Sequence, residues 1–229
     1  MPPYKIKLLA KKEIASGTMQ FEFEKPKNFS FKAGQYARMT LIEPPDIDEK
    51  GIARSLTIAS APREGRLIFA MRMRDSAFKN YLKNATIGTE VIIHGPFGDF
   101  VLPSKSERQI VFLIGGIGIT PVRSMMVGAK PEQRITLFWS NHQKSDAAFY
   151  DELMSLQNEN FKIIAIMTND PGWNGENSRI NREMIEKYVE NPNEAIYYIA
   201  GPPMFLESMK NMLTENGITR IMEDEFEGY

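Results

Sequence analysis

The nine residues from Leu113 to Pro121 constrain the fold of this chain more than any other segment. They contain three glycines, follow the apolar run 110–112 and precede a stretch that favours a helix. Glycine lets the backbone turn sharply and leaves room for a bulky group beside it. Thr120 suits the N-cap of that helix and Pro121 its first position, so free backbone N–H groups should face the same space. A strand, a glycine turn and a helix N-terminus together predict a site for a phosphate or another anion.

The lack of cysteine excludes several kinds of chemistry. The 229 residues contain no Cys and only two His, so they form no disulfide, no thiolate nucleophile and no ordinary iron–sulfur cluster. No metal site is expected, because neither His94 nor His142 has a second imidazole nearby in the sequence. The formal net charge of −1 gives no basic surplus for nucleic acid or an anionic membrane. The sequence has no apolar run long enough to span a membrane, and its first residues lack the apolar core of a secretory signal peptide. We therefore expect a cytoplasmic location.

The first hundred residues favour short strands separated by turns. β-branched, aromatic and alternating apolar residues mark six strands, and one helical stretch interrupts the series. Six strands with so little helix predict an antiparallel barrel. The expected strands are 4–10, 18–23, 36–41, 54–59, 67–73 and 90–94, and the expected helix is 76–82.

From about Arg108 the pattern changes to strands that alternate with helices, which predicts a parallel sheet covered on both faces. The polar segment 103–107 separates the two patterns, so we expect one domain at 1–102 and a second at 108–229. The expected strands of the second domain are 110–114, 135–139, 161–167 and 195–200, and its expected helices are 122–128, 147–157, 182–189 and 203–214.

Three other segments suit a nucleotide site. Arg54 begins a strand, where it is placed to hold a phosphate, and Thr57 follows on the same strand. A second strand ends in the segment 200–203, Ala-Gly-Pro-Pro, and a helix follows at once. Ligands of open parallel sheets bind beyond the carboxyl ends of the strands, so this loop should share an edge with the glycine turn. The third segment, 95–100, indicates a turn at the end of the barrel. Taken singly, each segment is also compatible with a purely structural role.

In this order and spacing, the motifs resemble those of the ferredoxin–NADP reductase superfamily. Within it, the chain is similar to flavin-dependent reductases that lack an iron–sulfur domain. The superfamily's flavin motif, Arg-x-aromatic-Ser/Thr, is matched by 54–57. Its nicotinamide-domain motifs, Gly-Gly-x-Gly-x-Thr-Pro and Cys/Ala-Gly-Pro-Pro, are matched by 115–121 and 200–203. The resemblance covers nearly the whole chain and implies an FAD-binding antiparallel barrel followed by an α/β NAD(P)-binding domain.

The resemblance also implies roles for residues on the flavin side. Arg54 would bind the FAD phosphates, and Thr57 would hydrogen-bond the flavin ring near N5. Leu56 would pack on the flavin where many relatives have tyrosine or phenylalanine. Lys79 stands where relatives often have serine. The other residues implied to bind FAD are Ser55, Ala70, Met71 and Arg72 along the cofactor, and Ala77 and Phe78 with Lys79 at a helix start that meets the pyrophosphate.

On the nicotinamide side, the resemblance assigns Thr120 a contact with both flavin and nicotinamide. Ala200 stands where many plant-type members have cysteine. Tyr229 would stack on the flavin face that nicotinamide must reach, with Phe226 as the rival ring, so the implied catalytic set is Thr57, Thr120 and Tyr229. The remaining residues implied to bind cofactor are Gly115, Gly116, Gly118, Pro121, Ser140, Asn141, His142, Gly201, Pro202, Pro203 and Met204.

The function implied by the resemblance is hydride transfer from NADPH or NADH to FAD, followed by electron delivery to a separate acceptor. That acceptor would be a ferredoxin, a flavodoxin, an oxygenase component or a small molecule. No acidic residue ends the strand 135–139, and Ser140, His142 and Lys144 suit a phosphate, so we expect NADPH to be preferred and NADH tolerated. Two alternatives stay open: a reductase of free flavin, and a non-catalytic interaction or regulatory subunit that keeps the fold.

Overall fold

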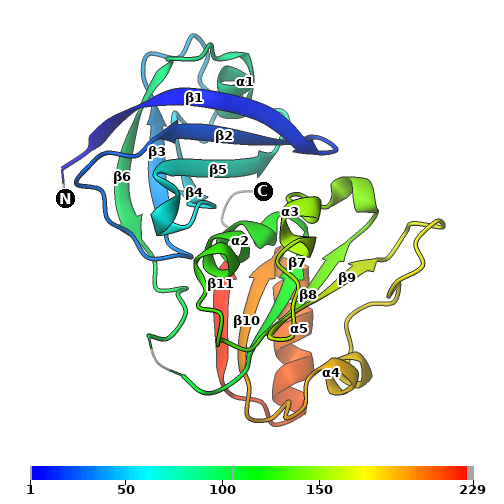
Figure 1. Ribbon diagram of the computed structural model, residues 1–229. Coiled ribbons are helices and arrows are strands. Elements are labelled where there is room, and N and C mark those ends of the chain that lie inside the picture. Colours follow the sequence, from blue (N-terminus) through cyan, green and yellow to red (C-terminus); the bar gives the residue numbers. More distant parts are fainter. Residues whose placement is uncertain (1, 105, 226–229) are drawn as a thin grey trace.

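A computed structural model describes residues 2–104 and 106–225 and contains two β-sheets formed by consecutive parts of the chain (Figure 1). The first sheet has strand order β4-β3-β6-β1-β2-β5 and is antiparallel, and the second has order β11-β10-β7-β8-β9 and is parallel. This arrangement confirms the expected fold class. The domain limits 1–102 and 108–229 stay a prediction, and the backbone passes between the sheets after Phe97 and before Ile110. Within the described ranges, no helix is long and apolar enough to cross a membrane.

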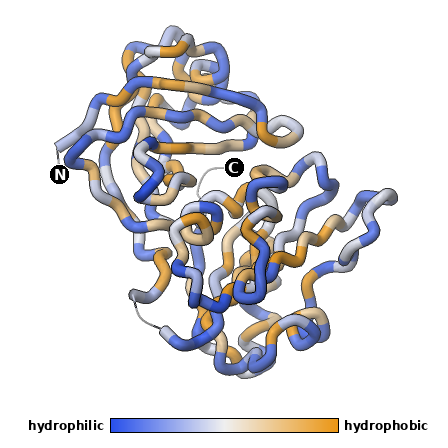
Figure 2. The backbone as a smooth tube through the Cα atoms, in the orientation of Figure 1, coloured by the Kyte–Doolittle hydropathy of each residue, from blue (hydrophilic) through white to orange (hydrophobic). Residues whose placement is uncertain are grey.

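The first sheet curls into a barrel, because its two edge strands meet where the Ala59 N–H donates to Ile68 O at 2.7 Å. Alternate side chains of its strands point inward, among them Ile6 and Leu8, and are fully buried. Figure 2 shows hydrophobic and hydrophilic residues alternating along β1 and β2, whereas β5 is hydrophobic over most of its length. The strands are β1 (Tyr4–Ala15), β2 (Thr18–Glu24), β3 (Tyr36–Leu41), β4 (Ala53–Thr57), β5 (Arg66–Arg72) and β6 (Glu90–Phe97).

Two short helical elements accompany the barrel. The 3₁₀ turn η1 (Pro62–Glu64) lies between β4 and β5, and the helix α1 (Ala77–Asn84) lies between β5 and β6. Ser76 begins α1, because its hydroxyl accepts the Lys79 N–H at 3.2 Å and so satisfies one free donor of the first turn. Phe78 and Leu82 anchor α1 in the barrel core.

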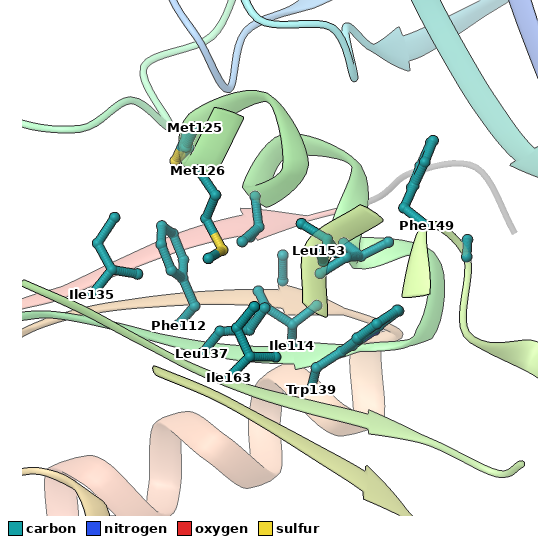
Figure 3. Packing of buried hydrophobic residues seen from close by; sticks show 14 of the residues in the cluster. Phe112, Ile114, Met125, Met126, Ile135, Leu137, Trp139, Phe149, Leu153 and Ile163 are labelled. Atoms are coloured by element: carbon teal, nitrogen blue, oxygen red, sulfur yellow. The ribbon is translucent and has the colours of Figure 1, made fainter. Parts of the chain in front are cut away.

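Helices cover both faces of the second sheet, so its central strands are almost continuously apolar. On one face, Phe112 and Leu137 pack against Met126 of α2 (Figure 3). The strands are β7 (Ile110–Gly115), β8 (Ile135–Asn141), β9 (Phe161–Met167), β10 (Ile196–Gly201) and β11 (Ile221–Glu225). The helices α2 (Ile119–Gly128) and α3 (Tyr150–Met154) lie on this face, and α4 (Arg182–Tyr188) and α5 (Pro203–Glu215) lie on the other.

Strand β1 extends five residues beyond the expected 4–10, and two other elements differ further from the expectation. Strand β11 was not expected, because three of its five residues are acidic and its pattern is too short to show a period. The expected helix 147–157 is reduced to α3, since Phe149 adopts a left-handed conformation with φ of 65° that interrupts the helix. The preceding residues form a separate 3₁₀ turn, η3 (Lys144–Asp146).

The two sheets are joined through a buried arginine, Arg123 of α2, which is 3% exposed. Its guanidinium donates to the carboxylate of Glu64 at 2.7 and 2.9 Å and to Ala59 O at 2.9 Å, and both acceptors follow β4 of the barrel. It also donates twice to Glu152 of α3. All five N–H donors therefore have acceptors, which is what a buried guanidinium requires.

The charges of this junction stabilise one another. Burial opposes the charge on Arg123, but its hydrogen bonds to Glu64 and Glu152 outweigh that effect and raise the pKa of the guanidinium. Burial likewise opposes the charge on Glu64, yet the Arg123 hydrogen bond and the Ala61 N–H hold the pKa of that carboxyl below its usual value. Beside this network, the Ser124 hydroxyl donates to Ser60 O at 2.6 Å. Helix α2 is thus tied to the segment that directly continues β4.

We predict that Arg123→Met lowers the free energy of unfolding by about 3 kcal/mol, because removing one partner leaves two carboxylates uncompensated at the junction. Urea unfolding followed by circular dichroism measures this, and separate transitions for the two domains should appear as they uncouple. Arg134→Met is the control, since its pair with Glu190 is 52% and 78% exposed, and it should change stability by less than about 1 kcal/mol. Equal losses in the two variants would contradict the assignment of Arg123 as the joint.

Candidate functional site

The glycine turn lies backbone to backbone against the end of β10. A Cβ placed on Gly118 would lie 2.6 Å from Ala200 O, so no side chain fits there. Gly116 has φ of +51°, and a Cβ there would meet nothing within 4 Å. The turn η2 (Gly116–Gly118) is therefore closely packed on one side and open on the other. The Trp139 indole N–H donates to Gly116 O at 3.2 Å and ties the turn to β8.

The expectation that Thr120 caps the following helix is wrong. Helix α2 begins at Ile119 with Gly118 in the cap position, because η2 runs into it without an intervening extended residue. The Thr120 hydroxyl instead donates to Ile117 O at 3.2 Å, and Thr120 is buried. Pro121 is consequently the third residue of the helix and not the first.

The barrel residues expected at a phosphate come together around the N-terminus of α1. The Arg54 guanidinium lies over the Phe78 ring, 5.2 Å from its centroid. The Lys79 ammonium donates to Arg72 O at 2.8 Å and so ties α1 to the end of β5. Burial, followed by the positive charges of Arg74, Lys50 and Arg54, lowers the pKa of Lys79. Arg54 and Lys79 thus both lie at this end of the helix, and the charges of Arg74 and Lys50 also act on Lys79.

An acidic residue that the sequence analysis did not single out, Asp48, lies in the middle of these groups. Its carboxylate accepts from Arg54 Nη2 at 2.8 and 3.0 Å and from the Ala77 N–H at 3.0 Å. Burial opposes its charge, but the hydrogen bond and the charge of Arg54 outweigh that effect and hold the pKa of Asp48 below its usual value. Arg54 and Ala77 are 23 residues apart in the sequence, and Asp48 joins them.

Ser140, Asn141 and His142 lie at the carboxyl end of β8, the edge shared with the glycine turn. Asn141 is 6% exposed, and neither its amide nitrogen nor its amide oxygen has a hydrogen-bond partner among the described residues. The Lys144 N–H donates to Asp170 Oδ2 at 3.1 Å, so an acidic residue from the turn after β9 also reaches this end of the sheet. The sequence pattern did not indicate this carboxylate, because Asp170 follows β9 and not β8.

The other expected residues occupy the same two regions. Ser55 is exposed, Leu56 is half-buried, and Thr57 is buried at the end of β4. Ala70 and Met71 are buried in β5, and Arg72 forms a 3.8 Å ion pair with Asp146 that links the regions. Gly115, Gly201 and Pro202 pack together where β7 and β10 end, and Pro203 and the exposed Met204 begin α5. Tyr229 and Phe226 lie outside the described residues.

The residues present suit both cofactors. Cationic side chains and a helix N-terminus suit a diphosphate, and the barrel offers both at α1. The open side of Gly116 leaves room for a flat ring against backbone. The unpartnered amide of Asn141 would gain hydrogen bonds from a polar ligand at the strand end. The barrel thus has a group of residues suited to a diphosphate at α1, and the second domain has open backbone at Gly116 and an unpartnered amide at Asn141.

Comparison with known proteins supports this interpretation. The model of the "Oxidoreductase FAD-binding domain" family matches residues 5–102, and that of the "Oxidoreductase NAD-binding domain" family matches residues 112–211. A component of the Na(+)-translocating NADH-quinone reductase from Methylococcus capsulatus is 30% identical over 198 residues, 79% of this chain and 47% of that protein. The reductase component of the glycine betaine monooxygenase of Chromohalobacter salexigens is 27% identical over 87% of this chain and 56% of its own length. The chain thus spans about half the length of these relatives.

Solved structures share the fold. A ferredoxin NADP+ reductase from Neisseria gonorrhoeae with bound FAD and NADP has a TM-score of 0.81 at 21% identity, over 97% of this chain and 98% of that one. A cytochrome P450 reductase of Amycolatopsis has a TM-score of 0.84 at 20% identity, over 98% of this chain and 70% of that one. The fold and the two matching family models define a two-domain flavoprotein. The chain belongs to the oxidoreductases that carry an FAD-binding domain followed by an NAD-binding domain, and its fold is that of the ferredoxin reductases.

Asp224 of β11 gives this edge of the sheet a pH-dependent charge. It lies beside Ala200 in the sheet register. Burial, with the like charge of Asp99 from the barrel end adding to it, raises its pKa to about 6. The folded protein therefore holds a proton between about pH 4 and pH 6 that the unfolded chain releases, so stability falls as pH rises through that window.

We predict that Asp224→Asn raises the free energy of unfolding at pH 7.5 by about 1 to 3 kcal/mol and changes it much less at pH 4. Thermal unfolding at a series of pH values measures the difference between variant and parent. Glu207→Gln, an exposed change on α5, should leave the pH dependence as it is. If Asp224→Asn retains the parent's fall in stability between pH 4 and 6, Asp224 is not the group responsible.

Proposed function

We propose that the chain catalyses hydride transfer from NADPH or NADH to bound FAD and delivers the electrons to a separate acceptor. One observation carries the proposal: the strand β4, with Arg54 and Thr57, continues into Ala59 and Ser60, whose carbonyls accept from α2. Helix α2 in turn follows directly from the glycine turn. The flavin motif and the nicotinamide motif are therefore fixed to each other through two hydrogen bonds.

When bound, FAD supplies a ring that accepts a hydride and passes electrons on one at a time. The residues of the chain bind, orient and enclose. Arg54, Lys79 and the N-terminus of α1 would hold the diphosphate. Because the start of α1 adds a second group suited to phosphate beside Arg54, we propose FAD and not FMN as the flavin. We propose that the hydroxyl of Thr57, which is buried at the end of β4, bonds the reacting end of the ring. Leu56 would contact the flavin with an aliphatic side chain at the position where many relatives have an aromatic ring.

The acceptor is the less determined part of the proposal. The 229 residues contain no cysteine, so they hold no iron–sulfur cluster of their own. One relative is named as the reductase component of a monooxygenase and another as a component of a quinone reductase. We propose a separate ferredoxin, flavodoxin or oxygenase component for this chain, or a small molecule. A reductase of free flavin and a non-catalytic subunit are the alternatives.

Purification followed by desalting distinguishes these functions. A yellow protein that releases FAD on heating, and oxidises NADPH with one acceptor in a panel of ferredoxin, flavodoxin, free flavin and ferricyanide, supports the proposal. Colour lost on desalting, with activity towards added flavin, indicates the free-flavin reductase. Protein that is colourless and cannot be reconstituted indicates the non-catalytic subunit. Release of FMN alone contradicts the assignment of FAD.

We predict that Arg54→Ala lowers FAD affinity about tenfold to 150-fold, because a charge-assisted phosphate contact contributes roughly 1.5–3 kcal/mol. Quenching of flavin fluorescence on titration into flavin-stripped protein measures the dissociation constant. Arg66→Ala is the control, since Arg66 pairs with Glu22 on the exposed side of β5. An Arg54→Ala protein that binds FAD like the parent would remove Arg54 from the cofactor site.

We predict a higher kcat/KM for NADPH than for NADH. Ser140, His142 and Lys144 suit the 2′-phosphate of NADPH. The Asp170 carboxylate, which accepts the Lys144 N–H, would repel that phosphate. Asp170→Asn should therefore shift the ratio further towards NADPH. Steady-state oxidation of both nucleotides with ferricyanide as acceptor gives the ratio for each protein. A parent enzyme that strongly favours NADH would show that Asp170 outweighs the other three groups.

A further inference from the structure

The Asp48 carboxylate makes the contacts that a phosphate at this site would need. It accepts two hydrogen bonds from Arg54 Nη2, and it accepts the Ala77 N–H at 3.0 Å. A phosphate held by Arg54 and by the N-terminus of α1 would use the same donors.

The Arg54 guanidinium is oriented by the backbone around it. Its Nη1 group donates to the carbonyls of Lys50, Gly51 and Ala53 at 2.8, 2.8 and 2.9 Å. These bonds fix the plane of the guanidinium, and they leave Nη2 as the end that points to an anion. Nη2 is the atom that both Asp48 oxygens contact. A phosphate therefore gains the hydrogen bonds of Nη2 only when Asp48 releases them.

Asp48 lies at the start of a short, exposed turn. Asp48 closes its own turn, since its carbonyl accepts the Gly51 N–H at 2.8 Å and its carboxylate accepts the Lys50 N–H at 3.0 Å. Residues 45–47, 49 and 50 are largely exposed, including Ile47 at 66%. Moving the whole turn would also break the Arg54 Nη1 bonds to Lys50 O and Gly51 O. Release of Arg54 Nη2 therefore requires the Asp48 side chain alone to turn away, with the loss of its bonds to Arg54, Ala77 and Lys50.

We propose that Asp48 is an internal competitor for the FAD diphosphate and thereby sets how tightly, and how fast, the chain binds its flavin. The inference rests on the proposed function, because it requires FAD to bind at Arg54 and α1. Only molecules in which Asp48 has released these donors can bind the diphosphate. The observed affinity for FAD is therefore the intrinsic affinity multiplied by the fraction of such molecules. A flavin that lacks phosphate does not meet this competition.

The test compares FAD with riboflavin, which carries the same ring and no phosphate. Asp48→Asn keeps the shape and an acceptor for the turn but removes the charge, and Asp48→Ala removes the competing group altogether. Both are titrated as flavin-stripped protein by fluorescence quenching, and association is followed by stopped flow. Glu49→Gln is the matched control, because it removes one negative charge from an exposed position of the same turn. Thermal unfolding checks that each variant is folded.

We expect Asp48→Asn to bind FAD about 3- to 30-fold more tightly and to associate faster, with the larger change for Asp48→Ala. Riboflavin affinity should stay at the parent value in both variants, and the Kd of inorganic pyrophosphate, measured by calorimetry on flavin-stripped protein, should fall. Unchanged or weaker FAD binding would overturn the inference, as would an equal gain for riboflavin or for Glu49→Gln. A parent protein that binds no FAD at all would overturn the proposed function, and the inference with it.

Discussion

The structure depends on one buried charge. Arg123 is buried away from water, and its five N–H groups are satisfied by two carboxylates and one carbonyl that come from two separate parts of the chain. Two of these acceptors belong to the segment after β4 and the third to α3. Because a buried guanidinium without these partners is strongly unfavourable, the barrel and the parallel sheet take one relative position. The hydride-transfer geometry proposed for this chain requires such a fixed relation between its two cofactor motifs.

The two motifs solve different physical problems. In the second domain, Gly118 is required because Ala200 O leaves no space for a Cβ, so this glycine serves the protein's own packing. Gly116 faces open space instead and suits a ligand. In the first domain, the problem is electrostatic: burial and the positive charges of Arg74, Lys50 and Arg54 lower the pKa of Lys79, and Asp48 pairs with Arg54. The barrel thus offers an anion site that already contains one internal anion.

Local patterns made much of this molecule predictable. Alternation along β2 and β3, the apolar runs of β7 and β8, and the Ser76 cap of α1 are encoded within a few residues, and the motif spacing indicated the family. Arg123 and Asp170 were missed because their partners lie far along the chain; Glu64 is 59 residues from Arg123. Asp48 was missed because its position beside α1 depends on Ala77, 29 residues away, although Arg54 is only six residues from it. The one local signal was an arginine within the apolar run 122–126. Thr120 was misjudged because an η2 turn before a helix moves the cap by two residues.

The most direct test of the account is the rate at which NADPH bleaches the visible flavin band under anaerobic stopped flow. It is measured in the FAD-saturated parent and in FAD-saturated Arg123→Met. If the junction aligns the two motifs, the parent bleaches fully, and the variant keeps its FAD but bleaches at least about tenfold more slowly. Equal rates would contradict the claim that Arg123 positions the reacting regions. A parent flavin that NADPH and NADH both leave oxidised would contradict the proposed reaction itself.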